Sequence, residues 1–472
     1  MTVANILEDK AAKLKASAVA KYPLPPLRIG NRTARLPIVQ GGMGVGLSLS
    51  GLASAVAEEG GIGVIAATGI GLIEADYYDR PLEANIRALR SEIRKARVKT
   101  TGILGVNIMV AADGFLRLLE AAVEEKIDLL FLGAGLPIKG IPVAAIRRAG
   151  VGVVPIVSSG RAARLIFKSW EKTYGDIPDA VVVEGPLAGG HLGFKPGQID
   201  DPDFQLEKIL PEVVEALREF ETPWGRAIPV IAGGGIYTGE DIRRMLGLGA
   251  RGVQLGTRFI ATEECDADAR FKQAYVACGK EDIVIIQSPV GLPGRAIRSP
   301  FLEDVAKGVR KVFRCPSHCL QSCGAKDARY CIAEALDHAR RGEFKDGFAF
   351  CGANAFRVRA IIPVADLVSG LRQGYALACF MASIKADYAK AAERMRSLKG
   401  EYSLILARIR EGFRDQLRRM SDENRAGFRA EKARFRAHLV RLRSDYLKAK
   451  AERRALEARL SLLRNQACSL EA

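Results

Sequence analysis

The stretch PVIAGGGIYTGEDIRRMLGLGARGVQLGTRF (229–259) contains two short apolar runs that end in glycine-bearing loops. Both runs are rich in β-branched residues, as expected for parallel strands that are buried on both faces. Between them, GEDIRRMLGLG (239–249) has the spacing of an amphipathic helix. A strand, a helix and a second strand in this order predict a βαβ unit.

The same alternation extends back from this stretch to about residue 37, with helix-like segments such as FLRLLEAAVEEK (115–126) between the apolar runs. Eight runs within about 220 residues favour an α/β fold of the (β/α)8 TIM-barrel type over an open, doubly wound sheet with fewer strands. The predicted strands are PIVQ (37–40), GIGVIAA (61–67), GILGVNIMV (102–110), LLFLGAG (129–135), GVVPIVSS (152–159), AVVVEG (180–185), PVIAGGG (229–235) and GVQLGTRF (252–259).

The loops after the last two predicted strands carry the clearest signal for a ligand. TIM barrels often bind a phosphate with the loops after strands seven and eight. Glycine lets backbone amides approach phosphate oxygens, and a following helix N-terminus favours negative charge. Either loop alone is more typical of a tight strand-to-helix turn, but the two together predict a phosphate site. The predicted cradle consists of Gly233, Gly234, Gly235, Gly256 and Thr257.

Five segments resemble the nitronate monooxygenase and 2-nitropropane dioxygenase family: QGGMGVG (40–46), GVNIMV (105–110), EGPLAGGHLG (184–193), AGGGI (232–236) and QLGTRF (254–259). The resemblance covers about residues 30–300 and implies FMN, bound without a covalent link at the carboxyl-terminal mouth of the barrel. It also implies flavin contacts from Gly42, Met43 and Gly44 against the ring, Asn107 at its polar edge, Glu184 and Gly189 along the flavin, and Gly233, Gly234, Gly235, Gln254, Gly256 and Thr257 at the ribityl phosphate.

His191 follows two glycines just beyond the sixth predicted strand, so its ring is expected to project over the barrel mouth. A nitroalkane needs a base that removes the proton next to the nitro group, and neutral imidazole titrates in a suitable range. We therefore expect FMN-dependent oxidation of alkyl nitronates or nitroalkanes by O2 to a carbonyl compound and nitrite, with His191 as the base. The alternative for His191 is a structural histidine that bonds a loop carbonyl.

Two other functions stay open at this point. The first is an NAD(P)H-dependent FMN reductase of an enoyl thioester, because the FMN-dependent enoyl reductases of fatty-acid synthesis share this barrel. By resemblance, those reductases often carry Glu at the position of Glu184, where many nitronate monooxygenases carry Gln. The second is a flavin-binding scaffold without catalysis, against which the intact motif around His191 argues.

A cysteine-rich segment follows the predicted barrel. Thiols at four-residue spacing can line one face of a helix and offer soft ligands to zinc or an iron–sulfur cluster, although this spacing matches neither a zinc ribbon nor a common ferredoxin run. A small helical cap with reduced, buried thiols is the favoured interpretation. The metal candidates are Cys315, Cys319, Cys323, Cys331 and Cys351, with His318 among them.

Beyond about residue 373 the chain has few glycines and is rich in Ala, Arg, Glu, Lys and Leu, which predicts long helix. Apolar residues recur with heptad-like spacing, which favours a coiled coil or helical hairpin that serves self-association or a protein partner. Residues 381–472 contain 23 Lys and Arg against 12 Asp and Glu, so most of the net charge of +17 lies there. The mixed charges and lack of aromatic stacking residues argue against specific nucleic-acid binding.

No run of eighteen apolar residues is present, and the N-terminus has no cleavable apolar core, so we expect a cytoplasmic protein without a transmembrane segment. The predicted organisation is a helical lead-in (1–30), the FMN-binding barrel (31–300), the cysteine-rich cap (301–372) and the basic helical extension (373–472).

Overall fold

The structure is a computed structural model that describes residues 16–315, 319, 323, 327–417 and 425–471. The chain divides into two compact units. The larger unit is Leu24–Tyr375, and the smaller one contains Ala376–Ala472 together with the residues before Leu24.

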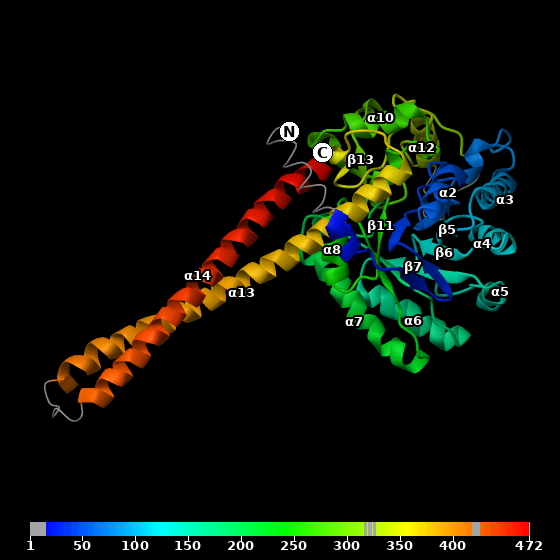
Figure 1. The fold of residues 1–472 in the computed structure, drawn as a ribbon. Helices are drawn as coiled ribbons and strands as arrows, with labels where there is room; N and C mark the ends of the chain where they lie inside the picture. The colour runs from blue at the N-terminus through cyan, green and yellow to red at the C-terminus, as the bar shows by residue number, and fades with distance from the viewer. Residues whose placement is uncertain (1–15, 316–318, 320–322, 324–326, 418–424, 472) are drawn as a thin grey trace. The chain divides into compact units, whose positions relative to one another are not determined.

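Parallel strands in the larger unit form a closed barrel with helices around it (Figure 1). The order around the barrel is β10, β11, β3, β4, β5, β6, β7, β8, so that pairing of β11 with β3 closes the sheet. The predicted TIM barrel is therefore confirmed, and each predicted strand overlaps one barrel strand. The strands are β3 (Ile38–Gln40), β4 (Ile62–Ala66), β5 (Ile103–Met109), β6 (Leu129–Gly133), β7 (Gly152–Val157), β8 (Val181–Glu184), β10 (Val230–Gly233) and β11 (Gly252–Leu255).

Helices pack on the outer face of the barrel through apolar side chains, and these side chains join those of the strands in one large core. The helix predicted from residue 239 is confirmed as α8, where Thr238 and Asp241 form a capping box at the first turn. The helices of this layer are α2 (Ser50–Glu58), α3 (Pro81–Lys99), α4 (Phe115–Glu124), α5 (Val143–Arg148), α6 (Gly160–Tyr174), α7 (Leu206–Trp224) and α8 (Gly239–Gly247). Two further helices, α9 (Thr257–Ile260) and α10 (Ala269–Ala277), follow β11 at the carboxyl end of the strands.

A second core fills the inside of the barrel, where Phe131 and Val64 are among the buried side chains. An antiparallel hairpin of β1 (Leu27–Ile29) and β2 (Arg32–Ala34) contributes Leu27 and Ile29 to this core. The lead-in predicted as helical thus contains a strand before residue 30. Because β1 is so short, its apolar residues show no alternation that would identify a strand in the sequence. These residues are apolar because they fill the barrel interior.

Past the barrel strands, the chain adds a small antiparallel sheet whose order is β12 (Ile283–Gln287), β13 (Pro293–Ile297) and β9 (Gly190–His191). The β9 segment comes from the loop after β8, so this sheet joins two parts of the chain that are far apart in sequence. The cap continues with α11 (Pro300–Ala306) and α12 (Ile332–Arg340). Aromatic side chains of Phe301, Tyr330 and Phe348 pack together beneath it.

The smaller unit is built on two long helices, α13 (Val364–Leu417), which begins in the larger unit, and α14 (Arg425–Glu471). Leu377 near the start of this unit packs with Leu463 near the end of the chain, so the two helices run antiparallel. Midway, the guanidinium of Arg453 lies 5.5 Å from the ring centre of Tyr388. The heptad-spaced Leu442, Ala449, Leu460 and Leu463 are buried. In the described part of the chain, no helix has the length and apolarity needed to cross a membrane.

The contact between β4 and α2 gives a test of the barrel's packing. A Cβ atom added at Gly63 would lie 1.8 Å from the carbonyl oxygen of Ala53, so Gly63→Ala must displace the helix from the strand. We expect a loss of about 1–3 kcal/mol in the free energy of unfolding, seen as a lower midpoint in thermal unfolding. Gly197→Ala is the matched control, because a Cβ there meets no atom within 4 Å. Equal midpoints for the two variants would contradict this packing.

Candidate active site

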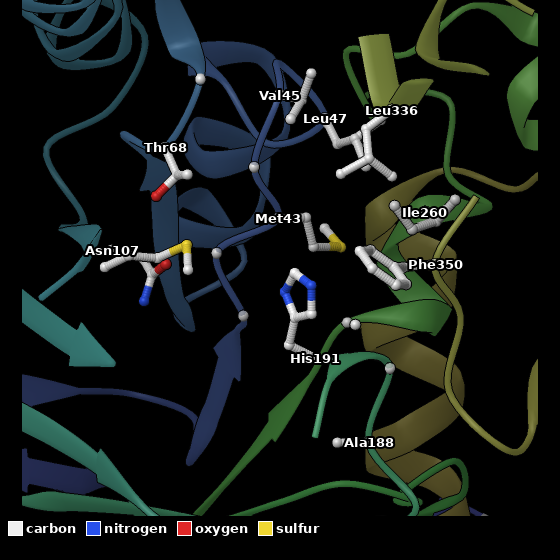
Figure 2. Close-up of a pocket in the computed structure, with 18 of the residues that line it drawn as sticks. Met43, Val45, Leu47, Thr68, Asn107, Ala188, His191, Ile260, Leu336 and Phe350 are labelled. Atoms are coloured by element: carbon white, nitrogen blue, oxygen red, sulfur yellow. The ribbon is translucent and has the colours of Figure 1, made fainter. Parts of the chain in front are cut away.

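A cavity of about 700 Å³ opens among the loops that follow the carboxyl ends of the barrel strands. Its size lies within the range of about 300–1,000 Å³ that is usual for small-molecule sites. Figure 2 shows His191 pointing into it, with Met43 and Phe350 close to the ring and Asn107 across the cavity. The predicted residues that line it are Gly42, Met43, Gly44, Asn107, Glu184, Gly189, His191, Gly234, Gly235, Gln254, Gly256 and Thr257.

Gly233 is the one residue of the predicted flavin site that does not line the cavity. It is the last residue of β10 and is paired with Glu184 of β8 and Gln254 of β11. Gly233 therefore belongs to the strand, which ends two residues before the predicted limit at residue 235, and the loop that faces the cavity begins at Gly234.

Two glycine loops form one end of the cavity. Gly234 and Gly235 adopt φ values of +95° and +81°, which L side chains rarely adopt. A Cβ at Gly235 would also lie 2.8 Å from the side chain of Leu187. The second loop places Gly256 and Thr257 beside the first, and a Cβ at Gly256 would meet only the sulfur of Met43, at 3.7 Å. Bare backbone thus faces the cavity from both loops, as the sequence predicted.

Another wall of the cavity is the segment after β3. Gly42 allows this segment to pass Asn107 closely, because a Cβ there would lie 2.3 Å from the Cβ of Asn107. Asn107 points across from β5 and donates to the carbonyl oxygen of Phe131 at 3.3 Å. Val45 has φ +58°, an unusual conformation for a β-branched residue, and its N–H donates to the carbonyl oxygen of Thr68 at 2.9 Å. Local backbone strain of this kind is common at ligand sites.

Glu184 ends β8 and starts the loop that leads to His191. Burial raises the pKa of Glu184 to about 7, so its carboxyl group is close to half protonated at neutral pH. The loop itself is fixed by Arg295, whose guanidinium donates to the carbonyl oxygens of Pro186 and Ala188 at 2.6 and 2.7 Å. These two hydrogen bonds fix the position of the loop that carries Gly189 and His191.

His191 is placed by β9, whose backbone pairs with Gly294 of β13. Its ring packs against Phe350 in an edge-to-face arrangement with the ring centres 5.0 Å apart. Its Nε2 atom lies 2.8 Å from the hydroxyl oxygen of Ser288. Burial lowers the pKa of His191 to about 4, so the imidazole is neutral across the physiological range.

The sequence did not identify the site residues that come from the cap. Phe350, Cys351, Gly352, Ala353 and Asn354 line the cavity. The N–H of Gly352 donates to the hydroxyl oxygen of Thr257 at 2.9 Å, and the amide of Asn354 donates to the carbonyl oxygen of Gly235 at 2.7 Å. Of these residues only Cys351 was singled out from the sequence, as a candidate metal ligand, and only the fold brings this segment against the two glycine loops.

The cysteines were candidates for a metal site only in the less favoured interpretation of the sequence. Within the described residues, no group of three or more His, Cys, Asp or Glu side chains is arranged to hold a metal ion. Cys315, Cys319 and Cys323 lie outside helices, so they share no helical face, and His318 lies outside the described residues. Burial raises the pKa of Cys319 to about 12, which favours the thiol. Cys351 is buried in the barrel core, and Cys331 precedes α12.

The residues at the glycine loops fit the phosphate group of FMN. Backbone amides face the cavity there, and two guanidinium groups, those of Arg258 and Arg357, lie 4.3 and 4.4 Å from the ring centre of Tyr237. In the part of the chain that the structure describes, the Tyr237 hydroxyl and the Nε atom of Arg258 are buried without a hydrogen-bond partner. Buried polar groups without partners are costly, so this end of the cavity suits an anionic ligand.

The comparisons with known proteins agree with this geometry. A curated relative from Mycobacterium tuberculosis, (3aS,4S,5R,7aS)-5-hydroxy-7a-methyl-1-oxo-octahydro-1H-indene-4-carboxyl-CoA dehydrogenase, is 30% identical over 275 residues. That match covers 58% of this chain and 66% of the relative, just under two thirds of its length. A probable nitronate monooxygenase from Staphylococcus aureus is 24% identical over 307 residues, which cover 57% of this chain and 78% of the relative.

Among solved structures, FabK from Thermotoga maritima is 27% identical with a TM-score of 0.56, and the match covers 72% of this chain and 93% of that one. The sequence model of the nitronate monooxygenase family matches residues 27–374, which include the barrel, the cap and every residue that lines the cavity. The chain therefore belongs to the nitronate monooxygenase family.

Proposed function

We propose that the chain is an FMN-dependent enzyme that oxidises alkyl nitronates with O2 to a carbonyl compound and nitrite. The observation that carries the proposal is that neutral His191 and the two glycine loops face one cavity. Glycine backbone and a neutral polar side chain thus meet at the barrel mouth, where TIM barrels place their active sites. Family membership supports the same reaction.

In this proposal, Gly234, Gly235, Gly256 and Thr257 hold the phosphate of FMN, and Asn107 meets the polar edge of the ring. The bound flavin supplies the electron acceptor for the reaction. The chain's own residues bind and orient the nitronate against it. Met43 and Phe350 shield the reacting carbon from water, because they place apolar side chains beside the His191 ring.

The charge state of the cavity suits an anionic substrate. His191 is neutral because burial lowers its pKa, and Glu184 is neutral below about pH 7 because burial raises its pKa. A nitronate carries its negative charge on two oxygens, and neutral polar groups can receive it without repulsion. The C–N bond then breaks, nitrite leaves and an oxygen atom from O2 takes its place on carbon, so that in the balanced reaction one O2 converts two nitronate ions into two carbonyl compounds and two nitrite ions.

A second candidate is oxidation or reduction of a coenzyme A or carrier-protein thioester. The relative from Mycobacterium tuberculosis is named as a carboxyl-CoA dehydrogenase, and the identity of 30% exceeds that of the nitronate monooxygenase relative. Glu184 favours this candidate as well, since enoyl reductases that resemble this chain often carry Glu there. A thioester reductase would need NAD(P)H as the source of electrons.

An anaerobic absorbance titration separates the two candidates. The flavin-loaded protein is mixed with propionate-3-nitronate in one cuvette and with NADPH in another, and the flavin band is followed. We expect rapid bleaching by the nitronate and none by NADPH within the same time, because only the nitronate fits the proposed reaction. Free FMN with the nitronate is the control for bleaching without the protein. Bleaching by NADPH alone would replace the proposal with the thioester reductase.

The pKa of Glu184 gives a second test through pH. A carboxyl group with a raised pKa is neutral below that value and charged above it, so Glu184 gains its charge as the pH rises through about 7. The bimolecular rate constant for anaerobic flavin reduction by the nitronate should therefore fall by about tenfold between pH 6 and pH 8, because the carboxylate repels the anion.

Glu184→Gln keeps the shape of the side chain and removes its charge. The rate constant for flavin reduction by the nitronate in this variant should therefore not change over the same pH range. Stopped-flow measurement of flavin bleaching at each pH checks both proteins. An unchanged pH profile in the variant would show that another group titrates.

A further inference from the structure

His191 has a single hydrogen-bonding partner among the described side chains, Ser288. The two residues are 97 positions apart in sequence and meet because β9 and the β12–β13 hairpin belong to one small sheet. The Nε2 atom of His191 lies 2.8 Å from the hydroxyl oxygen of Ser288, and Ser288 is only 4% exposed. It does not line the cavity. Ser288 therefore supports the imidazole ring from the protein side.

The backbone around Ser288 fixes where its hydroxyl lies. The N–H of Ser288 donates to the carbonyl oxygen of Leu292 at 3.0 Å, and its carbonyl oxygen accepts from the N–H of Gly291 at 3.0 Å. Gly291 turns the chain with φ +82°. The N–H of Val290 approaches the Ser288 hydroxyl oxygen at 3.4 Å as a weak donor. The hydroxyl is thus part of a tight turn whose geometry leaves its side chain little freedom.

The proton of this hydroxyl determines the tautomer of His191. Among the described residues, the only acceptor within hydrogen-bonding distance of the Ser288 hydroxyl is Nε2 of His191. If Nε2 carried the imidazole proton, Ser288 would accept from both His191 and Val290, and its own buried proton would have no acceptor. A buried donor without an acceptor is costly, so the hydroxyl donates to Nε2. The proton of neutral His191 is then on Nδ1.

The Nδ1 atom has no hydrogen-bonding partner among the described residues. It is also not among the fully buried polar atoms, so it is accessible from the cavity. Since His191 lines the cavity, Nδ1 is the ring nitrogen that a ligand can reach. Phe350 packs edge-to-face against the ring and keeps it in this orientation. We propose that Ser288 holds His191 as the Nδ1–H tautomer, so that His191 donates a hydrogen bond to an anionic oxygen of the substrate and does not act as a base.

This role differs from the one that the sequence suggested. A base needs an unprotonated nitrogen that faces the substrate, and in this tautomer the only lone pair of the ring accepts from Ser288. An N–H that faces the cavity instead stabilises negative charge on a nitronate oxygen, in an apolar site where such a bond is strong. The substrate of the proposed function is then a preformed nitronate and not a neutral nitroalkane. This consequence rests on the proposed function. Ser288 is a positioning residue, and His191 contacts the substrate.

The tautomer can be measured directly and without any assumption about the reaction. The chain has four histidines, so long-range ¹H–¹⁵N correlation spectra of histidine-labelled, FMN-loaded protein are simple, and the signal missing in His191→Gln belongs to His191. We expect the proton on Nδ1 in the wild type and in Ser288→Thr, which keeps the hydroxyl. In Ser288→Ala we expect a mixture of tautomers. A proton on Nε2 in the wild type would overturn the proposal, and so would an unchanged spectrum in Ser288→Ala.

Flavin reduction under anaerobic conditions tests the consequence for the substrate. A freshly prepared nitronate should bleach the flavin at least about 100-fold faster than the corresponding neutral nitroalkane, because no base is present to ionise the latter. Ser288→Ala should slow the reaction with the nitronate by about 10- to 100-fold, and Ser288→Thr should restore most of it. Equal rates with nitronate and nitroalkane would contradict the donor role. If neither compound bleaches the flavin although the spectra place the proton of His191 on Nδ1, only the proposed function is contradicted.

Discussion

Hydrogen bonding between β11 and β3 closes the barrel, and the position of the site follows from that closure. Because all the barrel strands are parallel, their carboxyl ends meet at one mouth, and the loops that leave them surround a single cavity. Glycine keeps that cavity open. At Gly42 it lets the first loop pass Asn107, and at Gly234 and Gly235 it provides the left-handed backbone that exposes amides to the phosphate end.

The chemistry of the cavity is set by burial more than by charge pairs. Burial shifts the pKa of Glu184 upward and that of His191 downward, so both groups are drawn toward their neutral forms. Positive charge is concentrated elsewhere, on Arg258 and Arg357 beside Tyr237. Tyr237 lines the cavity, whereas the two guanidinium groups that flank its ring do not, and the region around His191 is neutral and partly apolar. The hydroxyl of Ser288 determines which nitrogen of His191 carries the proton, and therefore which nitrogen can donate a hydrogen bond to a ligand.

Most of the barrel could be predicted from the sequence, because each strand is a short apolar run and each run ends in a turn signal. The glycine loops and His191 could be located for the same reason, since they follow strands directly. The rest depends on contacts between distant segments. Ser288 meets His191 across 97 positions, and Asn354 reaches Gly235 across 119, so no local spacing marks them. The regular spacing of Cys315, Cys319 and Cys323 suggested a helical face, but the chain does not form a helix at those residues.

If the two glycine loops hold the phosphate of a flavin, a side chain that fills the space between them must weaken the binding of FMN. A Cβ at Gly256 meets only the sulfur of Met43, and its φ of −112° lies outside the left-handed region, so Gly256→Val places its side chain toward the cavity. Fluorescence titration with FMN should show one site in the wild type and affinity weakened by at least about 100-fold in the variant. Equal affinity in a folded Gly256→Val protein would mean that the flavin phosphate does not lie between these loops.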